Sequence, residues 1–206
     1  QSFLKRIRSH AEKGLSFNGN TSDEAKLKAC REFYEKETES VKNLHRGGAS
    51  GREVVRSLTA IVDSMIQALS KTAFAEFKAR SNEESQLAIS VVAIGGYGRS
   101  ELCPLSDVDL MFLYPSKTSA STLKSAQEFV VQRILYVLWD LGLKVGHSSR
   151  TVDDAFAEAR KDIQTKTALL ESRLIYGSQT LFAGFESSYN LFYRKEDPKA
   201  YIRQRL

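Results

Sequence analysis

The sequence predicts a mixed α/β (α+β) fold, in which a short mixed sheet is flanked by N-terminal and C-terminal helices. Two features indicate this class. Long stretches carry apolar residues at three- and four-residue steps, as amphipathic helices do, and short runs of β-branched residues lie between them. The 206 residues are 42% hydrophobic and 27% charged, which is the composition of an ordinary soluble protein with a real core.

Helices dominate the first part of the chain. A short helix followed by a loop is expected within residues 1–20. Thr21 is the predicted N-cap of a second helix, because Glu24 follows three residues later, and Gly47 is the predicted end of that helix. A third helix is expected over residues 52–78, with these apolar residues facing inward: Val54, Val55, Leu58, Ile61, Val62, Met65, Ile66, Leu69 and Phe74.

A glycine turn between a strand and a short helix forms the centre of the chain. Residues 87–94 are apolar and β-branched, which predicts a buried strand. Gly95 and Gly96 then allow a close backbone approach that a side chain would block. A short helix is expected over residues 97–102, with its first N–H groups directed at the glycine turn. A glycine turn beside a helix N-terminus favours the binding of a phosphate group.

Two carboxylates open the next predicted strand. Asp107 and Asp109 are two residues apart, so a strand points both side chains to one face while Val108 and Leu110 point to the core. Neighbouring carboxylates repel each other unless a cation lies between them. Because Mg²⁺ binds through one or two carboxylates together with substrate phosphates, the sequence predicts a magnesium site beside the glycine turn.

The rest of the chain alternates again between helix and strand. A helix over residues 122–141 is expected to end at Gly142 and to rest on the sheet through Trp139. A third strand over residues 143–149 contains His147, which is interpreted either as a structural residue or as part of the site.

Helices are expected in the last part of the chain. One begins at Thr151, one covers residues 162–176, and one covers residues 178–194. Glu171 and Arg173 are interpreted as an internal ion pair, with a place in the pocket wall as the alternative.

The predicted organisation has three parts. Residues 1–80 form a helical N-terminal segment, residues 81–160 form the core, and residues 161–206 form a C-terminal helical segment. A polar linker at the start of the second part and a turn followed by a basic helix at the end of the third are also expected. The final helix runs to the last residue, so we expect the chain to be a piece of a longer protein.

Charge and cysteine content restrict the partners and the compartment. The net charge of +5 comes from basic residues dispersed among acidic ones, which does not indicate a nucleic-acid partner. No apolar run is long enough to span a membrane, so no membrane partner is expected. Only Cys30 and Cys103 are cysteines, which favours a reducing, cytoplasmic location and makes a zinc site improbable.

One long motif resembles a known family. Gly95 to Leu110 reads Gly-Gly-Tyr-Gly-Arg-Ser-Glu-Leu-Cys-Pro-Leu-Ser-Asp-Val-Asp-Leu. This segment resembles the nucleotidyltransferase superfamily that includes DNA polymerase beta, and more closely its branch of bacterial uridylyltransferases acting on the nitrogen-signalling protein PII. Residues 138–140, 145–151 and 171–177 also look like that branch, so the resemblance runs from about residue 51 to about residue 182.

The resemblance implies a polymerase-beta-like core and a specific reaction. In that reaction UMP passes from UTP to a tyrosine of PII and pyrophosphate leaves, with Mg²⁺ as the cofactor. Asp107 and Asp109 would be the catalytic and metal-binding residues. The residues that would bind the nucleotide are Gly95, Gly96, Arg99 and Ser106.

One departure from the superfamily keeps alternatives open. Most members carry a third carboxylate on a later strand, whereas Gly146 or His147 stands at that place here. A related adenylyltransferase that modifies glutamine synthetase is one alternative, although its family keeps an acidic third strand. A nucleotide-sensing module without catalysis is the second. A nucleic-acid nucleotidyltransferase would require a basic stripe with aromatic residues, which is not seen.

Overall fold

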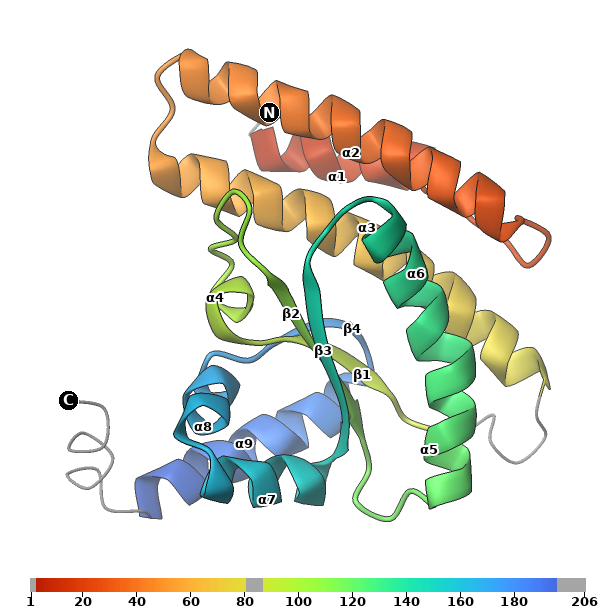
Figure 1. The fold of residues 1–206 in the computed structure, drawn as a ribbon, viewed down its shortest axis with the longest axis vertical. Coiled ribbons are helices and arrows are strands. Elements are labelled where there is room, and N and C mark those ends of the chain that lie inside the picture. Colours follow the sequence, from red (N-terminus) through yellow and green to blue (C-terminus); the bar gives the residue numbers. More distant parts are fainter. Residues whose placement is uncertain (1–2, 81–86, 196–206) are drawn as a thin grey trace.

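The computed structural model describes residues 3–80 and 87–195, and it confirms the mixed α/β class (Figure 1). Four strands form one sheet in the order β3-β2-β1-β4. Their bounds are Ser90–Ala93 for β1, Val108–Tyr114 for β2, Val145–Thr151 for β3 and Arg173–Gly177 for β4. β1 runs antiparallel to both β2 and β4, while β2 and β3 run parallel. The predicted linker at residues 80–85, the predicted turn at residues 195–198 and the predicted basic helix at residues 200–206 lie almost wholly outside the described residues.

Three N-terminal helices precede the sheet: α1 (Phe3–Gly14), α2 (Asp23–Arg46) and α3 (Gly51–Arg80). All three were expected, but the predicted N-cap of α2 is wrong. Ser22 caps this helix by accepting from the Ala25 N–H, since the Thr21 hydroxyl already bonds Asn18 in the preceding loop. Because the Thr21 hydroxyl bonds within the loop, the Ser22 hydroxyl is the one that caps the helix.

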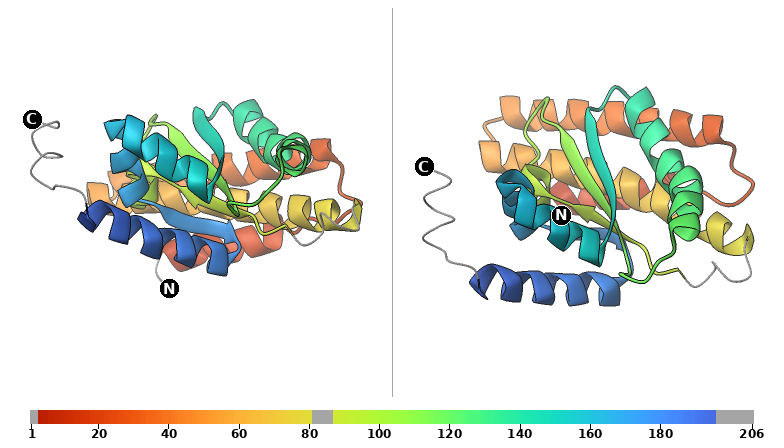
Figure 2. Two further views of the ribbon diagram at one scale, coloured as in Figure 1. Left: turned by 90° about the horizontal axis from the view of Figure 1, so that it is seen from below. Right: turned by 60° about the horizontal axis from the view of Figure 1, so that its bottom comes forward.

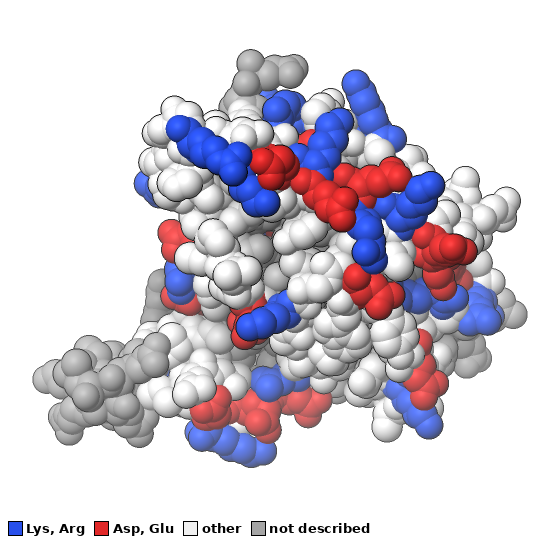
Figure 3. Space-filling model, turned by 45° about the horizontal axis from the view of Figure 1, so that its top comes forward, with Lys and Arg blue, Asp and Glu red and all other residues white. Residues whose placement is uncertain are grey.

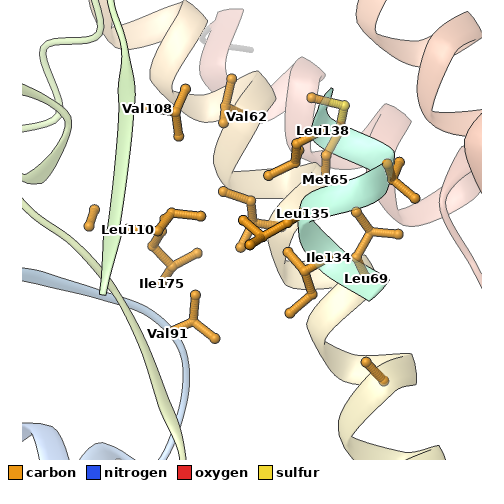
Figure 4. Close-up of a cluster of buried hydrophobic side chains, with 14 of the residues drawn as sticks. Val62, Met65, Leu69, Val91, Val108, Leu110, Ile134, Leu135, Leu138 and Ile175 are labelled. Carbon is orange, nitrogen blue, oxygen red and sulfur yellow. The ribbon is translucent and has the colours of Figure 1, made fainter. Parts of the chain in front are cut away.

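One face of the sheet carries the larger apolar core. α3 and α6 (Gln132–Asp140) cover this face, and Figure 4 shows side chains from both helices meeting side chains from the strands. Those labelled there are Val62, Met65, Leu69, Val91, Val108, Leu110, Ile134, Leu135, Leu138 and Ile175. Because α1 and α2 pack on the same cluster through residues such as Ile7 and Cys30, the N-terminal helices share their core with the sheet.

The other face carries a second core. α7 (Val152–Lys161), α8 (Ile163–Leu170) and α9 (Gln179–Lys195) lie there, below the sheet in Figure 1. Val92, Met111 and Leu113 point into this cluster, while their neighbours along the strands point into the first one. β1 and β2 are therefore buried on both faces, which explains why they read as continuous apolar runs.

The expected central helix is one continuous helical stretch. It consists of α5 (Ala120–Ala126), the π-helical turn η2 (Gln127–Val131) and α6, and it ends before Gly142, whose φ is +79°. This positive φ favours glycine, as the predicted stop requires.

Three expectations about the sheet and its connections are wrong. Residues 162–176 were expected to be helical, but the helix α8 stops at Leu170 and residues 173–177 form β4. Without β4, one edge of β1 would have unpaired backbone groups. Pairing with β1 therefore overrides the local helical preference of residues 173–177. The short helix α4 covers Gly95–Gly98 rather than 97–102, since Ser100 leaves the helix with φ of +63°. β3 extends to Thr151, two residues beyond the predicted end.

The proposed division at residues 80 and 160 stays a prediction. Figure 2 shows α1 to α3 on one side of the sheet and α7 to α9 on the other.

On the face shown in Figure 3, basic and acidic side chains lie interspersed. No helix in the described part of the chain is long and apolar enough to cross a membrane.

The contact between α4 and the end of α8 gives the first prediction. A Cβ built on Gly98 would lie 1.7 Å from the Glu171 carbonyl oxygen, a backbone atom that cannot move aside cheaply. We expect Gly98→Ala to lower the free energy of unfolding by about 2–3 kcal/mol in denaturant titrations. Gly184→Ala is the matched control. Gly184 lies within α9 with open space around it, so alanine there should stabilise by up to about 1 kcal/mol. Equal effects at the two sites would contradict this packing.

Candidate active site

The glycine turn lies directly beside the acidic pair. β1 ends at Ala93, and the Ile94 N–H donates to the Asp109 carbonyl at 3.1 Å, which ties the turn to β2. Gly95 then takes a φ of +60°, and a Cβ there would lie 3.8 Å from the Asp109 Oδ2. The structure thus brings together Gly95, Gly96 and Asp109, which sequence reasoning placed in one site. With four residues, α4 is a single helical turn.

The Asp109 carboxylate lies between two glycines. On the side of β1 it faces Gly95, and on the side of β3 it faces Gly146, its partner in the parallel register. A Cβ on Gly146 would lie 2.5 Å from the Asp109 Oδ1, so a side chain there would force the carboxylate out of its present position. Gly146 is therefore the residue at the place of the third carboxylate, and its lack of a side chain gives Asp109 its room.

His147 does not belong to this cluster. It pairs with Leu110 in the register, so its side chain points to the opposite face of the sheet from Asp109. There its ring packs edge-on against Trp139 of α6, with 5.7 Å between the ring centroids. The contact confirms that Trp139 packs on the sheet, and it favours the structural interpretation of His147.

The acidic pair has the electrostatics of a cation site. Asp107 is exposed just before β2, and Asp109 is half-buried within it. Burial raises the pKa of the Asp109 carboxyl, and the charge of Asp107 raises it further. Two hard oxygen donors in mutual repulsion fit Mg²⁺ well, since a divalent cation would relieve both effects. Among residues 3–80 and 87–195, no group of three or more His, Cys, Asp or Glu side chains could hold a metal ion.

Arg99 is held by two carboxylates. Its Nε donates to Glu101 at 3.1 Å and its Nη1 donates to Glu171, so the expected Glu171–Arg173 ion pair is wrong. The hydrogen bond that Arg99 donates to Glu101 and the charge of Glu171 raise the pKa of Arg99. The Arg99 side chain stays 48% exposed, and its Nη2 lies 3.6 Å from the place of a Gly96 Cβ. Phosphate oxygens could replace either carboxylate.

Ser106 lies in a tight turn before the acidic pair. Its N–H and its hydroxyl both donate to the Cys103 carbonyl, at 3.2 Å and 2.9 Å. Leu105 within this turn has a φ of +65° and is 95% exposed. The turn places Ser106 next to Asp107, but its hydroxyl is directed to the backbone of the loop. A nucleotide-binding role for Ser106 stays a prediction.

A partly buried polar network beside the turn was missed by sequence reasoning. The Asp63 carboxylate on α3 accepts from Arg173 at 2.8 and 3.1 Å and from the Tyr97 hydroxyl at 2.7 Å. Arg173 also donates to the carbonyls of Tyr97 and Gly98, both at 3.2 Å. Burial, followed by the charge of Asp63, raises the pKa of Tyr97. An aspartate inside the apolar stripe of the third helix was the signal that could have revealed it.

Comparisons with known proteins indicate the family of this chain. A family model described as glutamate-ammonia ligase adenylyltransferase matches residues 4–138, and so ends before β3. Three similar proteins are bifunctional uridylyltransferase/uridylyl-removing enzymes. That of Azospirillum brasilense is 41% identical over 133 residues, which is 65% of this chain and 14% of the relative. That of Erythrobacter litoralis is 36% identical over 165 residues, 80% of this chain and 17% of the relative.

The third relative, from Cereibacter sphaeroides, is 42% identical over 137 residues, which is 66% of this chain and 14% of the relative. The matched part of the chain thus corresponds to 14–17% of the length of these three relatives.

The partly buried network gives a second prediction. Asp63→Asn keeps the size of the side chain but leaves Arg173 without its counter-charge, and we expect the free energy of unfolding to fall by about 1–3 kcal/mol. Thermal and denaturant unfolding would measure this loss. Glu39→Gln is the control, because Glu39 pairs with Lys42 and Arg46 on the exposed surface, and its midpoint should stay nearly unchanged. If Asp63→Asn left the free energy of unfolding unchanged, the network would not contribute to stability.

The raised pKa of Asp109 gives a third prediction. A carboxyl with a raised pKa in the folded state destabilises that state above this pKa, because the ionised form is disfavoured there. Without divalent cations, Asp109→Asn should therefore be more stable than the wild type at pH 7. The gain should shrink as the pH falls through the raised pKa and vanish below about 3.9, the ordinary value.

Adding Mg²⁺ provides the internal control for the same unfolding experiment. The wild type should gain stability with Mg²⁺, while the Asp109→Asn variant should not. If Asp109→Asn were less stable than the wild type at pH 7 without metal, the ionised Asp109 carboxylate would not destabilise the folded state.

Proposed function

Because the chain belongs to the nucleotidyltransferase family described as glutamate-ammonia ligase adenylyltransferase, we propose that it transfers UMP from UTP to a tyrosine of the PII protein. The observation that carries the proposal is the Asp109 carboxylate, which lies beside Asp107 and between the glycine turn and Gly146. The choice of UMP over AMP is supported by the uridylyltransferase names of the relatives.

The residues of the turn would bind the triphosphate. Gly95 and Gly96 leave the backbone open to phosphate oxygens, and Arg99 would exchange Glu101 and Glu171 for the outer phosphates. Asp107 and Asp109 would hold Mg²⁺, and a bound Mg²⁺ would stabilise the negative charge that develops on the leaving pyrophosphate. Arg99 would add a second positive charge on the same side of the reacting phosphorus.

The acceptor would approach from the other side of Asp109. The tyrosine oxygen would form a bond to the α-phosphorus and pass its proton to solvent water, while the bond from that phosphorus to the bridging oxygen breaks and pyrophosphate leaves. Gly146 is exposed and has no side chain, so it would leave this side of Asp109 accessible to the acceptor. The chain positions donor and acceptor, which is the main protein contribution in phosphoryl and nucleotidyl transfer.

We place the protein in the cytoplasm, since both cysteines, Cys30 and Cys103, are free thiols. Two other functions remain as alternatives for the same site. The description of the family model favours an adenylyltransferase acting on glutamine synthetase. The absence of a third acidic side chain beside Asp109 in the described residues favours a nucleotide-sensing module.

Label transfer tests the proposal. The chain is incubated with Mg²⁺, PII protein and each of the four nucleoside triphosphates labelled at the α-phosphate, and glutamine synthetase replaces PII in a parallel set. We expect label on PII from UTP only. The Asp107→Asn, Asp109→Asn double variant should lose all transfer, because it cannot hold the cation, while its circular dichroism stays that of the wild type.

The other outcomes identify the alternatives. Label on glutamine synthetase from ATP would identify an adenylyltransferase. Saturable UTP binding without label on any protein would identify a sensing module. A double variant that still transfers label would refute the metal site.

A further inference from the structure

The edge of the sheet next to Asp109 has backbone groups that no described element satisfies. β3 is the first strand in the order β3-β2-β1-β4, so one of its sides has no strand partner. Among the described residues, no backbone hydrogen bond joins residues 145–150 to anything except β2. Figure 2 shows β3 at the outer margin of the sheet, between α6 and α7. Exposed strand edges pair readily with another extended chain.

The register identifies which groups point outward. The Val108 N–H donates to the Lys144 carbonyl at 2.8 Å, so Lys144 and every second residue after it direct their backbone groups to β2. The N–H and C=O groups of Val145, His147 and Ser149 must then point away from the sheet. At the end of the strand, the Thr151 N–H is satisfied by the Asp154 side chain, which closes the edge there.

We propose that the extended segment of the acceptor protein that carries the reacting hydroxyl pairs with the free edge of β3, beside Gly146 and Asp109. The inference rests on the proposed function, because it concerns how that acceptor is held. An added strand would lie about 4.8 Å from β3. Its residue opposite Gly146 would point to the same face as Asp109, and no side chain stands between them.

The reach across this edge fits a hydroxyl on a long side chain. Asp109 lies on β2, two strand spacings or roughly 10 Å from the added strand. The Asp109 carboxylate covers part of this distance, since its Oδ1 already lies against Gly146. A tyrosine lying over Gly146 can cover the rest while leaving room for the phosphate between them. A glycine in the edge strand allows such a close approach of a ligand.

Charge and exposed aromatic side chains support a protein segment as the occupant. Residues 144–151 include Lys144 and Arg150 and no acidic residue, so the edge complements a segment with acidic residues. Tyr136 and Trp139 of α6 are 55% and 40% exposed, and Trp139 contacts His147 of β3. Aromatic residues are enriched at protein–protein interfaces, and strand addition supplies main-chain hydrogen bonds beside them.

A proline substitution separates the backbone from the side chain. His147→Pro removes an outward N–H, and proline is tolerated on edge strands where the N–H faces solvent. His147→Ala keeps that N–H and removes only the ring. In label transfer from UTP to PII, we expect His147→Pro to lose at least tenfold in rate while His147→Ala stays within twofold of the wild type. Both variants should bind UTP with Mg²⁺ as the wild type does.

Residue-resolved amide hydrogen exchange of the wild type tests the contact without catalysis. Adding PII protein should slow exchange at Val145, His147 and Ser149. If PII binds and protects other amides, or does not bind, the inference is wrong. Normal transfer by His147→Pro would also overturn it and leave the proposed function intact. Protection of β3 without any label transfer would support the inference and refute the proposed reaction. If a higher concentration of this chain alone slows exchange at these amides, without PII protein, the edge of β3 pairs with a second copy of the chain and the inference is wrong.

Discussion

The carboxylate of Asp63 is the interaction on which the geometry of the candidate site depends. One side chain of α3 binds Arg173 of β4 through two hydrogen bonds and Tyr97 of α4 through a third. A single helical turn such as α4 cannot be stable alone, because its nucleation cost is not recovered by further turns. Arg173 compensates by donating to two carbonyls of that turn. The glycine turn is thus held from outside, by elements that lie far from it in the sequence.

Each partner of this network would be costly if left alone. Asp63 and Arg173 are 19% and 28% exposed at their side chains, so each would lose much of its hydration without the other. Together they satisfy each other and the backbone of α4. The result is a rigid support directly beside the residues that we propose to bind phosphate. Such support is what a site needs in order to hold charged groups in a fixed geometry.

The strand order gives the Asp109 carboxylate one side that faces β1 and one side that faces β3. Asp109 lies on β2, with Gly95 at the β1 side and Gly146 at the β3 side. In the proposed reaction the triphosphate occupies the first side and the acceptor hydroxyl the second. Gly146 leaves space for the Asp109 Oδ1 that a larger residue would take, while the positive φ of Gly95 is the feature that favours glycine on the other side. The same carboxylate is strained by burial and by Asp107, and sites for cations commonly reduce stability in this way.

The sequence by itself determined the features that depend on local pattern. The alternation of β2, the long apolar stripe of α3, the glycine turn and the adjacent Asp107 and Asp109 were all legible, because strand period, helix period and turn chemistry act over a few residues. The motif from Gly95 to Leu110 also identified the nucleotidyltransferase family that the match over residues 4–138 shows.

Only the tertiary structure decided the features that depend on pairing across the chain. Residues 173–177 became a strand because β1 needed a second neighbour, and Arg173 found Asp63 rather than Glu171 as its partner. The parallel register of β2 with β3 decided that Gly146, and not His147, faces Asp109. These outcomes could not be derived from local sequence, since they depend on which distant backbone and charged groups remain unsatisfied once the sheet has formed.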